Sequence, residues 1–200
     1  MPGALVGAIN GFVDRMKGKG LSSSSFLTQI GRSTAQSSGG GNIYSNLSAA
    51  GIGNGADTTA DVLMSCALPA NILDIPGRCV TLQAFGSVSA TSATKTVGFV
   101  WGGGSLSQSI IQYTTTNTGQ WQVYVQIFKT AANVQIALFQ ADGSGTVATL
   151  LGSAVQRGTL INTSGSEVDT AAITMSITGQ SSVATAGIVK CNGFIVDAYN

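Results

Sequence analysis

The sequence predicts an all-β protein: an antiparallel, jelly-roll-like β-sandwich preceded by an N-terminal amphipathic helix and a flexible Ser/Gly-rich arm. Apolar and polar residues alternate over much of residues 57–200, and turn-forming residues interrupt that alternation at intervals of roughly a dozen positions. No amphipathic helix separates the expected strands, which argues against an α/β fold. The 200 residues are enough for one well-buried domain with an appendage.

The first segment, residues 1–20, has the apolar period of a helix. Basic residues follow at its C-terminal end, where cations favour the helix dipole, and two glycines then end it. We expect this helix to need a partner surface, because short helices are marginal alone. The residues expected to contact that surface are Leu5, Ile9, Phe12, Val13, Arg15, Met16, Lys17 and Lys19.

The second segment, residues 21–56, has the composition of a flexible linker, with Ser/Gly runs at 22–25, 36–41 and 51–55. Scattered apolar residues suggest an arm that is extended when free and pinned when docked. Residues 1–40 carry a net charge of +3 (four basic, one acidic), and residues 41–200 carry −2 (five basic, seven acidic). The positive end of the chain is therefore the arm.

The third segment, residues 57–200, is the predicted sandwich. Pro69 should end a strand because it cannot donate to a ladder, and Gly86 should allow a bend or bulge. We interpret Lys95 as a charge that protects an exposed strand edge. Nine strands are expected to begin near residues 61, 78, 95, 108, 120, 133, 146, 171 and 187.

The composition narrows the classes of partner. Only 8% of the residues are charged, against roughly 25% in ordinary domains, which suits a surface covered by copies of itself or by neighbours. A net charge of +1 provides no basic field for nucleic acid, and no apolar stretch approaches a membrane span. The N-terminus lacks the pattern of a secretory signal, so we expect synthesis in the cytoplasm.

Nothing in the sequence indicates a catalytic residue, a cofactor or a transition-metal site. The chain has no histidine and only three cysteines, of which Cys66 and Cys191 are expected to be small buried hydrophobic residues. Two acidic pairs, Asp57/Asp61 and Glu167/Asp169, could bind calcium or act as an acid pair. We favour the alternative that they are solvated loop carboxylates or strand caps.

The aromatic residues also leave two interpretations open. Trp101, Tyr113, Trp121 and Tyr124 could form a platform that stacks on a sugar, or they could belong to the core. Their strand positions favour the core, and no ligand-binding residue is assigned.

Two stretches of the sandwich resemble a β-sandwich domain of tailed-phage virion proteins: ADTTADVLMSCALPANIL (residues 56–73) and GRCVTLQAFGSVSATSATKTVGFVWGG (residues 77–103). The resemblance covers about 45 residues of these two stretches and extends loosely, by strand order, over residues 57–200. It implies a virion protein of the head-fibre, capsid-decoration or tail-fibre type, usually a homotrimer. The first 55 residues take no part in it.

Three functions follow as hypotheses. The first is a capsid decoration (cement) or head-fibre protein on the virion surface, trimerised by its β domain and attached to the major capsid protein by the N-terminal segment. The second is a tail-fibre or spike module that recognises a host surface glycan. The third is a calcium-dependent lectin or hydrolase-like enzyme on the same fold.

Overall fold

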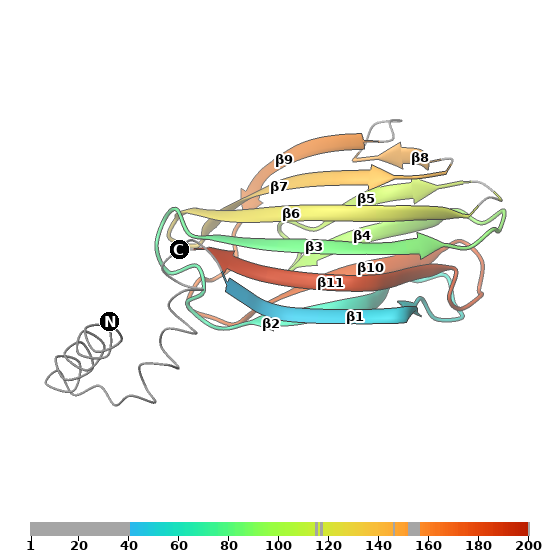
Figure 1. Ribbon diagram of the computed structural model, residues 1–200. Coiled ribbons are helices and arrows are strands. Elements are labelled where there is room, and N and C mark those ends of the chain that lie inside the picture. Colours follow the sequence, from blue (N-terminus) through green and yellow to red (C-terminus); the bar gives the residue numbers. More distant parts are fainter. Residues whose placement is uncertain (1–40, 115, 117, 146, 152–156, 200) are drawn as a thin grey trace, which may run out of the picture. The chain divides into compact units, whose positions relative to one another are not determined.

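The computed structural model describes residues 41–199 apart from 115, 117, 146 and 152–156, and this part of the chain forms two antiparallel sheets packed face to face (Figure 1). One sheet has the order β1-β11-β3-β6-β7-β9, and the other has the order β2-β10-β4-β5-β8. The strands are β1 (Gly41–Gly53), β2 (Asp61–Leu68), β3 (Cys79–Val88), β4 (Lys95–Trp101), β5 (Gln108–Tyr113), β6 (Gly119–Ala131), β7 (Val134–Gly143), β8 (Val147–Leu150), β9 (Arg157–Gly165), β10 (Ile173–Ser181) and β11 (Val189–Tyr199).

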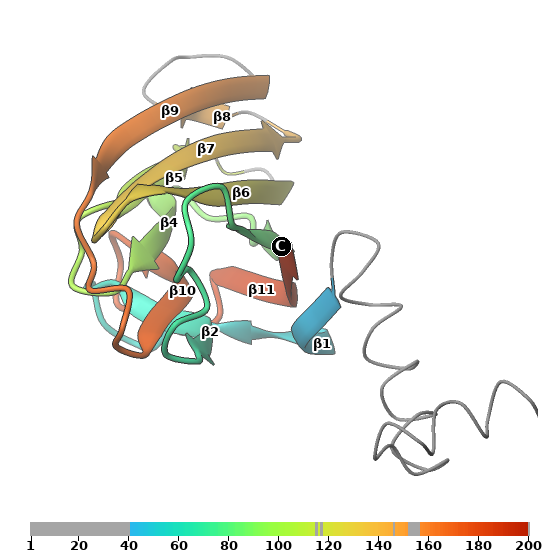
Figure 2. The same cartoon turned by 90° about the vertical axis from the view of Figure 1, so that its left-hand side faces the viewer.

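The predicted all-β sandwich is confirmed. The chain changes sheet at every connection between the described strands except β4–β5 and β6–β7, and Figure 2 shows the two layers from the end. The nine predicted strand starts all fall within two residues of observed strands, because period-two alternation with β-branched residues marks a half-buried strand. The predicted N-terminal helix lies outside the described residues.

The core lies between the sheets and is built by the alternation itself. In β6, Trp121, Val123, Val125 and Ile127 are buried, while the residues between them point away from the core. Phe99 of β4 and Phe139 of β7 meet edge to face across the sheets, with ring centroids 5.6 Å apart. Such pairs contribute about 0.5–1.5 kcal/mol beyond their buried area.

Strands β1 and β9 were not predicted. Strand β1 occupies part of the segment assigned to the arm, and it forms the edge of the six-stranded sheet beside β11. Tyr44 of β1 packs edge to face on Phe194 of β11, with centroids 5.9 Å apart, and Ile43 also packs against the core. The hydrogen bonds between strands are formed by the backbone, so even a Ser/Gly-rich stretch can pair with the free edge of a sheet.

Asn54 holds the end of β1 in place. Its side chain is 2% exposed, and its Oδ1 accepts a hydrogen bond from Val189 N at 2.9 Å. Its Nδ2 donates to the carbonyl oxygens of Gly55 and Thr185 at 2.9 and 3.1 Å. The sequence run GIGNG, expected to be linker, therefore contains a buried structural anchor.

Lys95 does not protect an edge, so that interpretation was wrong. It begins β4, which lies in the middle of its sheet between β10 and β5, and the residue is fully buried. Its Nζ donates to Thr91 O at 2.6 Å. Burial lowers the pKa of the Lys95 ammonium, because the charged form is the one that loses solvation.

Candidate functional site

The predicted capsid-anchor residues, Leu5, Ile9, Phe12, Val13, Arg15, Met16, Lys17 and Lys19, lie outside the described residues, and their role stays a prediction. Among the described residues, no helix is long and apolar enough to cross a membrane.

The first acidic pair supports local turns. Asp57 Oδ1 accepts hydrogen bonds from the Thr59 hydroxyl at 2.7 Å and from Thr59 N at 2.8 Å, and these bonds lower the pKa of the Asp57 carboxyl. Asp61 Oδ2 accepts from Gly55 N at 2.7 Å. These contacts fit the expected role of loop carboxylates.

The second acidic pair is split between two environments. Glu167 Oε1 accepts from Gly103 N at 2.8 Å and from the Ser105 hydroxyl at 3.2 Å, so it holds the turn after β4. Asp169 is buried and lies 2.6 Å from Lys129 Nζ. The expectation of a solvated carboxylate is therefore wrong for Asp169, because an ammonium compensates its burial. Within the described part of the chain, no group of three or more His, Cys, Asp or Glu side chains could hold a metal ion.

Three of the four candidate platform aromatics are core residues. Trp101, Tyr113 and Trp121 are at most 2% exposed. Tyr113 satisfies its hydroxyl by donating to Gln120 O at 2.7 Å. Tyr124 differs, because it lies half-buried on the face of the six-stranded sheet that points away from the core, which we call the open face.

Several amide side chains point outward on the open face. The same alternation that buries Trp121 and Val123 turns Gln120 and Gln122 outward on β6. Gln83 of β3 and Gln140 of β7 are outward-facing and exposed in the same way. For Gln83, Gln120 and Gln122 the signal was present in the sequence, as glutamines that alternate with apolar residues, whereas Gln140 is in phase with the apolar Val134, Ile136 and Leu138. Periodicity also does not say which strands are neighbours.

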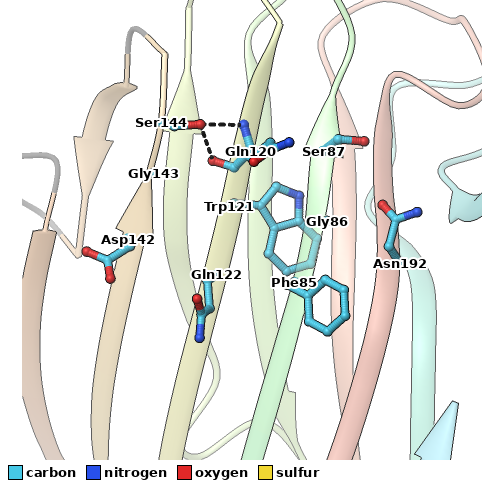
Figure 3. Close-up of a pocket in the computed structure, with 10 residues that line it drawn as sticks. All are labelled: Phe85, Gly86, Ser87, Gln120, Trp121, Gln122, Asp142, Gly143, Ser144 and Asn192. Carbon is cyan, nitrogen blue, oxygen red and sulfur yellow. Dashed lines mark hydrogen bonds between the residues drawn. The ribbon is translucent and has the colours of Figure 1, made fainter. Parts of the chain in front are cut away.

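A hollow of about 930 Å³ opens on this face across β11, β3, β6 and β7 (Figure 3). The directly paired row Phe85–Gln122–Asp142 crosses it, because Phe85 pairs with Gln122 and Gln122 pairs with Asp142. Its lining residues are Phe85, Gly86, Ser87, Gln120, Trp121, Gln122, Asp142, Gly143, Ser144 and Asn192.

Phe85 places an aromatic ring beside the hollow. The residue is 37% exposed, and it pairs with Gly193 of β11. A Cβ atom on Gly193 would lie 2.3 Å from the Phe85 Cε1 and Cζ atoms, so the ring covers the glycine. Because Gly193 has no side chain, the Phe85 ring can lie flat on its backbone. The other face of the ring presents apolar surface to solvent, as a stacking platform does. Sequence reasoning missed Phe85, since an isolated phenylalanine in a strand is ordinarily core.

The floor beside Phe85 depends on a second glycine. Gly86 pairs with Trp121 and with Cys191, and a Cβ atom there would lie 1.9 Å from Lys190 O and 2.5 Å from the Trp121 ring. A register shift in β11 follows directly, between Cys191 and Gly193. The predicted irregularity at Gly86 thus occurs on the neighbouring strand, where the extra residue, Asn192, reaches the hollow.

A second hollow, of about 410 Å³, continues the first toward β9. The two share Gln122 and Asp142, and the second adds Gln83, Tyr124, Gln140, Ala141, Gly158 and Thr159. Burial raises the pKa of the Tyr124 hydroxyl, with the nearby Tyr199 adding to the effect, so this phenol stays neutral. Gln126 Nε2 donates to that hydroxyl at 3.1 Å.

Comparisons with known proteins match no family model and no curated protein. Among solved structures, the CBM2 module of the evolved Dit of Lactobacillus casei BL23 phage J-1 is similar over 68% of each chain, at 12% identity and a TM-score of 0.39. Peanut lectin is similar over 80% of this chain and 97% of its own, at 8% identity and a TM-score of 0.40. The PL-14 alginate lyase from Aplysia kurodai reaches a TM-score of 0.31 at 5% identity, over 64% of this chain and 69% of its own. At these values the likeness concerns the β fold and carries no functional argument.

Proposed function

We propose that this protein is a non-enzymatic, phage-virion β-sandwich that binds a glycan on the open face of its six-stranded sheet. The observation that supports the proposal is the hollow beside Phe85, where an exposed aromatic ring lies next to outward-facing amides. Amides both donate and accept hydrogen bonds, as sugar hydroxyls do, and an apolar ring covers the C–H face of a sugar. Binding sites of this kind combine apolar surface with a few placed polar groups.

The carboxylates of the described part support this assignment over hydrolysis. Asp57, Asp61, Glu167 and Asp169 each accept hydrogen bonds that stabilise a turn or loop. Asp142 alone among the described carboxylates lines the hollows. Acid–base hydrolysis of a glycoside ordinarily needs a pair of carboxylates on the two sides of the bond.

The experiment is a glycan-array screen with the purified full-length protein, followed by inhibition of phage adsorption to host cells. Phe85→Ala and Gln122→Ala should each weaken binding, by about three- to tenfold for the amide. Val62→Ala is the control, because Val62 is 58% exposed on β2 of the other sheet. Absence of binding to any glycan, or equal loss in the control, would refute the proposal.

Gly193→Ala tests the platform without removing the ring. The new Cβ atom must displace Phe85, so glycan affinity should fall as it does in Phe85→Ala. Gly55→Ala is the matched control, since its Cβ atom would make only ordinary contacts of 3.4 Å or longer. Unchanged affinity in Gly193→Ala would show that the ring position is unimportant.

The location of the protein on the virion belongs to the same proposal and rests on the sequence of residues 1–40. The apolar stripe of residues 5–16 and the basic Arg15, Lys17 and Lys19 would attach the protein to the major capsid protein, and the β domain would trimerise. An arm that orders on docking loses entropy, so three linked copies would supply avidity. Deletion of residues 1–40 should abolish capsid attachment but leave a folded trimer by light scattering. A truncated chain that still decorates capsids would place the anchor elsewhere.

A further inference from the structure

We infer that the ligand of the open face is an uncharged polysaccharide bound along several consecutive sugar units, rather than an anionic glycan or a single sugar. This inference rests on the proposed glycan-binding function and specifies its substrate class. Two observations support it. The described lysine and arginine side chains of residues 41–200 lie outside the hollows, and the two hollows are continuous.

Three of the five cations in residues 41–200 are engaged away from the hollows. Residues 41–200 contain five lysines and arginines. Lys129 is paired with Asp169, Arg78 with Asp74, and Lys95 is buried in the other sheet. An anionic glycan is ordinarily recognised by Arg or Lys, because these form charge-assisted hydrogen bonds with carboxylate, sulfate or phosphate.

Lys190, the described one of the two remaining cations, lines neither hollow. The stem of Lys190 lies against β1, where Cβ atoms on Gly51 and Gly53 would stand 3.0 to 3.6 Å from its carbons. Arg157 is the backbone register partner of Asp142, on β9. A basic residue and the acidic residue of the hollows thus stand at paired positions of neighbouring strands, and their formal charges cancel.

Most of the polar side chains that line the two hollows are neutral. The amides that line the two hollows are Gln83, Gln120, Gln122, Gln140 and Asn192, joined by hydroxyls of Ser87, Ser144 and Thr159. An anion placed here would lose its hydration and find amides and hydroxyls, but no cation, among the described lining residues. A neutral ligand rich in hydroxyl groups has no charge to desolvate, and its hydroxyls can hydrogen-bond to the amides.

The hollows are continuous and long. They share Gln122 and Asp142, and together they reach from Asn192 on β11 to Thr159 on β9. Five adjacent strands lie in that span, and strand spacings of about 4.8 Å make it roughly 19 Å across. Several pyranose rings placed end to end fit this length, with the ring of Phe85 at one end and Gln140 and Thr159 at the other.

The first experiment is an array of neutral polysaccharides (dextran, laminarin, galactan) and anionic ones (alginate, polygalacturonate, teichoic acid), applied to the full-length protein at 0.05 and 0.5 M NaCl. We expect neutral ligands only, with binding unchanged by salt, since screening acts on charges. Binding of anionic glycans alone, or loss of binding in high salt, would overturn the inference and leave the proposed function standing. Absence of any binding would refute both.

The second experiment uses calorimetry with a series of one to six sugar units cut from the neutral polysaccharide that binds. Affinity should rise with length by roughly tenfold or more before it levels, as successive units meet new groups. Gln140→Ala should weaken the hexasaccharide about three- to tenfold and leave the shortest ligand that binds unchanged, whereas Phe85→Ala should weaken both. Ser65→Ala, an exposed change on β2, is the control. A monosaccharide that binds as tightly as the hexasaccharide would overturn the inferred length.

Discussion

Lys129 and Asp169 form a buried ion pair, with Nζ and Oδ2 2.6 Å apart and each side chain only 6% exposed. The carboxylate also accepts hydrogen bonds from Asn133 N at 2.6 Å and Gln135 Nε2 at 2.8 Å. Lys129 Nζ donates in addition to Asp74 O at 2.9 Å. The pair thus connects the loops that follow β2, β6 and β9 at one end of the sandwich.

The first prediction is that Asp169→Asn destabilises the protein by about 3–5 kcal/mol, because it leaves the Lys129 charge buried without its partner. Urea unfolding followed by tryptophan fluorescence measures the loss. Asp74→Asn is the matched control, since its ion pair with Arg78 is partly exposed (27% and 42% for Arg78 and Asp74) and should contribute about 1 kcal/mol or less. Equal losses in the two variants would show that burial of the pair is energetically unimportant.

The second prediction concerns acid. Burial alone would raise the pKa of the Asp169 carboxyl, but hydrogen bonds from Lys129, Asn133 and Gln135 outweigh it and hold that pKa below its ordinary value. The unfolded state therefore binds the proton more tightly. The resulting stability is present above the unfolded pKa of about 3.9 and is lost as the pH falls through the lower, folded value.

The free energy of unfolding of the parent protein should accordingly approach that of Asp169→Asn as the pH is lowered from 7 to below 3. Urea titrations at a series of pH values measure this difference. A difference that stays constant down to pH 2.5 would contradict the lowered pKa.

The third prediction distinguishes the observed domain boundary from the one expected from composition. A chain that begins at residue 41 should unfold at nearly the same temperature as the full chain, whereas a chain that begins at residue 57 should be strongly destabilised. The second lacks β1, with the Tyr44–Phe194 contact and the buried hydrogen bond from Val189 N to Asn54. Thermal denaturation by circular dichroism compares the three chains, and equal stability of the two truncated chains would show that β1 is dispensable.

The fourth prediction concerns the thiols. Cys66, Cys79 and Cys191 are free and buried. Burial raises the pKa of Cys79 to about 11 and that of Cys191 to about 12, and it raises the pKa of Cys66 as well. A thiol reagent at pH 8 should therefore react slowly with the folded protein, because only the thiolate reacts. After unfolding, it should react rapidly with all three thiols. Rapid labelling of a thiol in the folded state would refute this.

Lys95 and Asp169 show where sequence reasoning about charges failed. Both were interpreted as solvent-facing, because an isolated charge seldom lies inside a protein. Their burial depends on groups distant in sequence or on a neighbouring turn: Lys129 lies 40 positions from Asp169, and the carbonyl oxygen of Thr91 is an acceptor for Lys95. Local composition carries no information on such partners.

The open face shows a different limit. Phe85, Gln122 and Asp142 are separated by 37 and 20 positions, yet they form one row, because β3, β6 and β7 are neighbours in the sheet. Alternation predicts that glutamines point outward, but it does not predict which outward residues meet. The platform also needs Gly193 under Phe85, a relation that depends on the register after the irregularity in β11.

The sequence by itself determined the all-β class and nine of the eleven strands in the described part of the chain, because these follow from period-two alternation and turn residues within short windows. Alternation does not settle which face of β7 is buried, since Gln135, Ala137 and Phe139 face the core and Val134 is exposed. Only the tertiary structure decided the pairing order, the recruitment of β1, the burial of Lys95 and Asp169, and the assembly of Phe85, Gln122 and Asp142 into one hollow. These features depend on contacts between residues far apart in the chain, and such contacts exist only once the two sheets have packed.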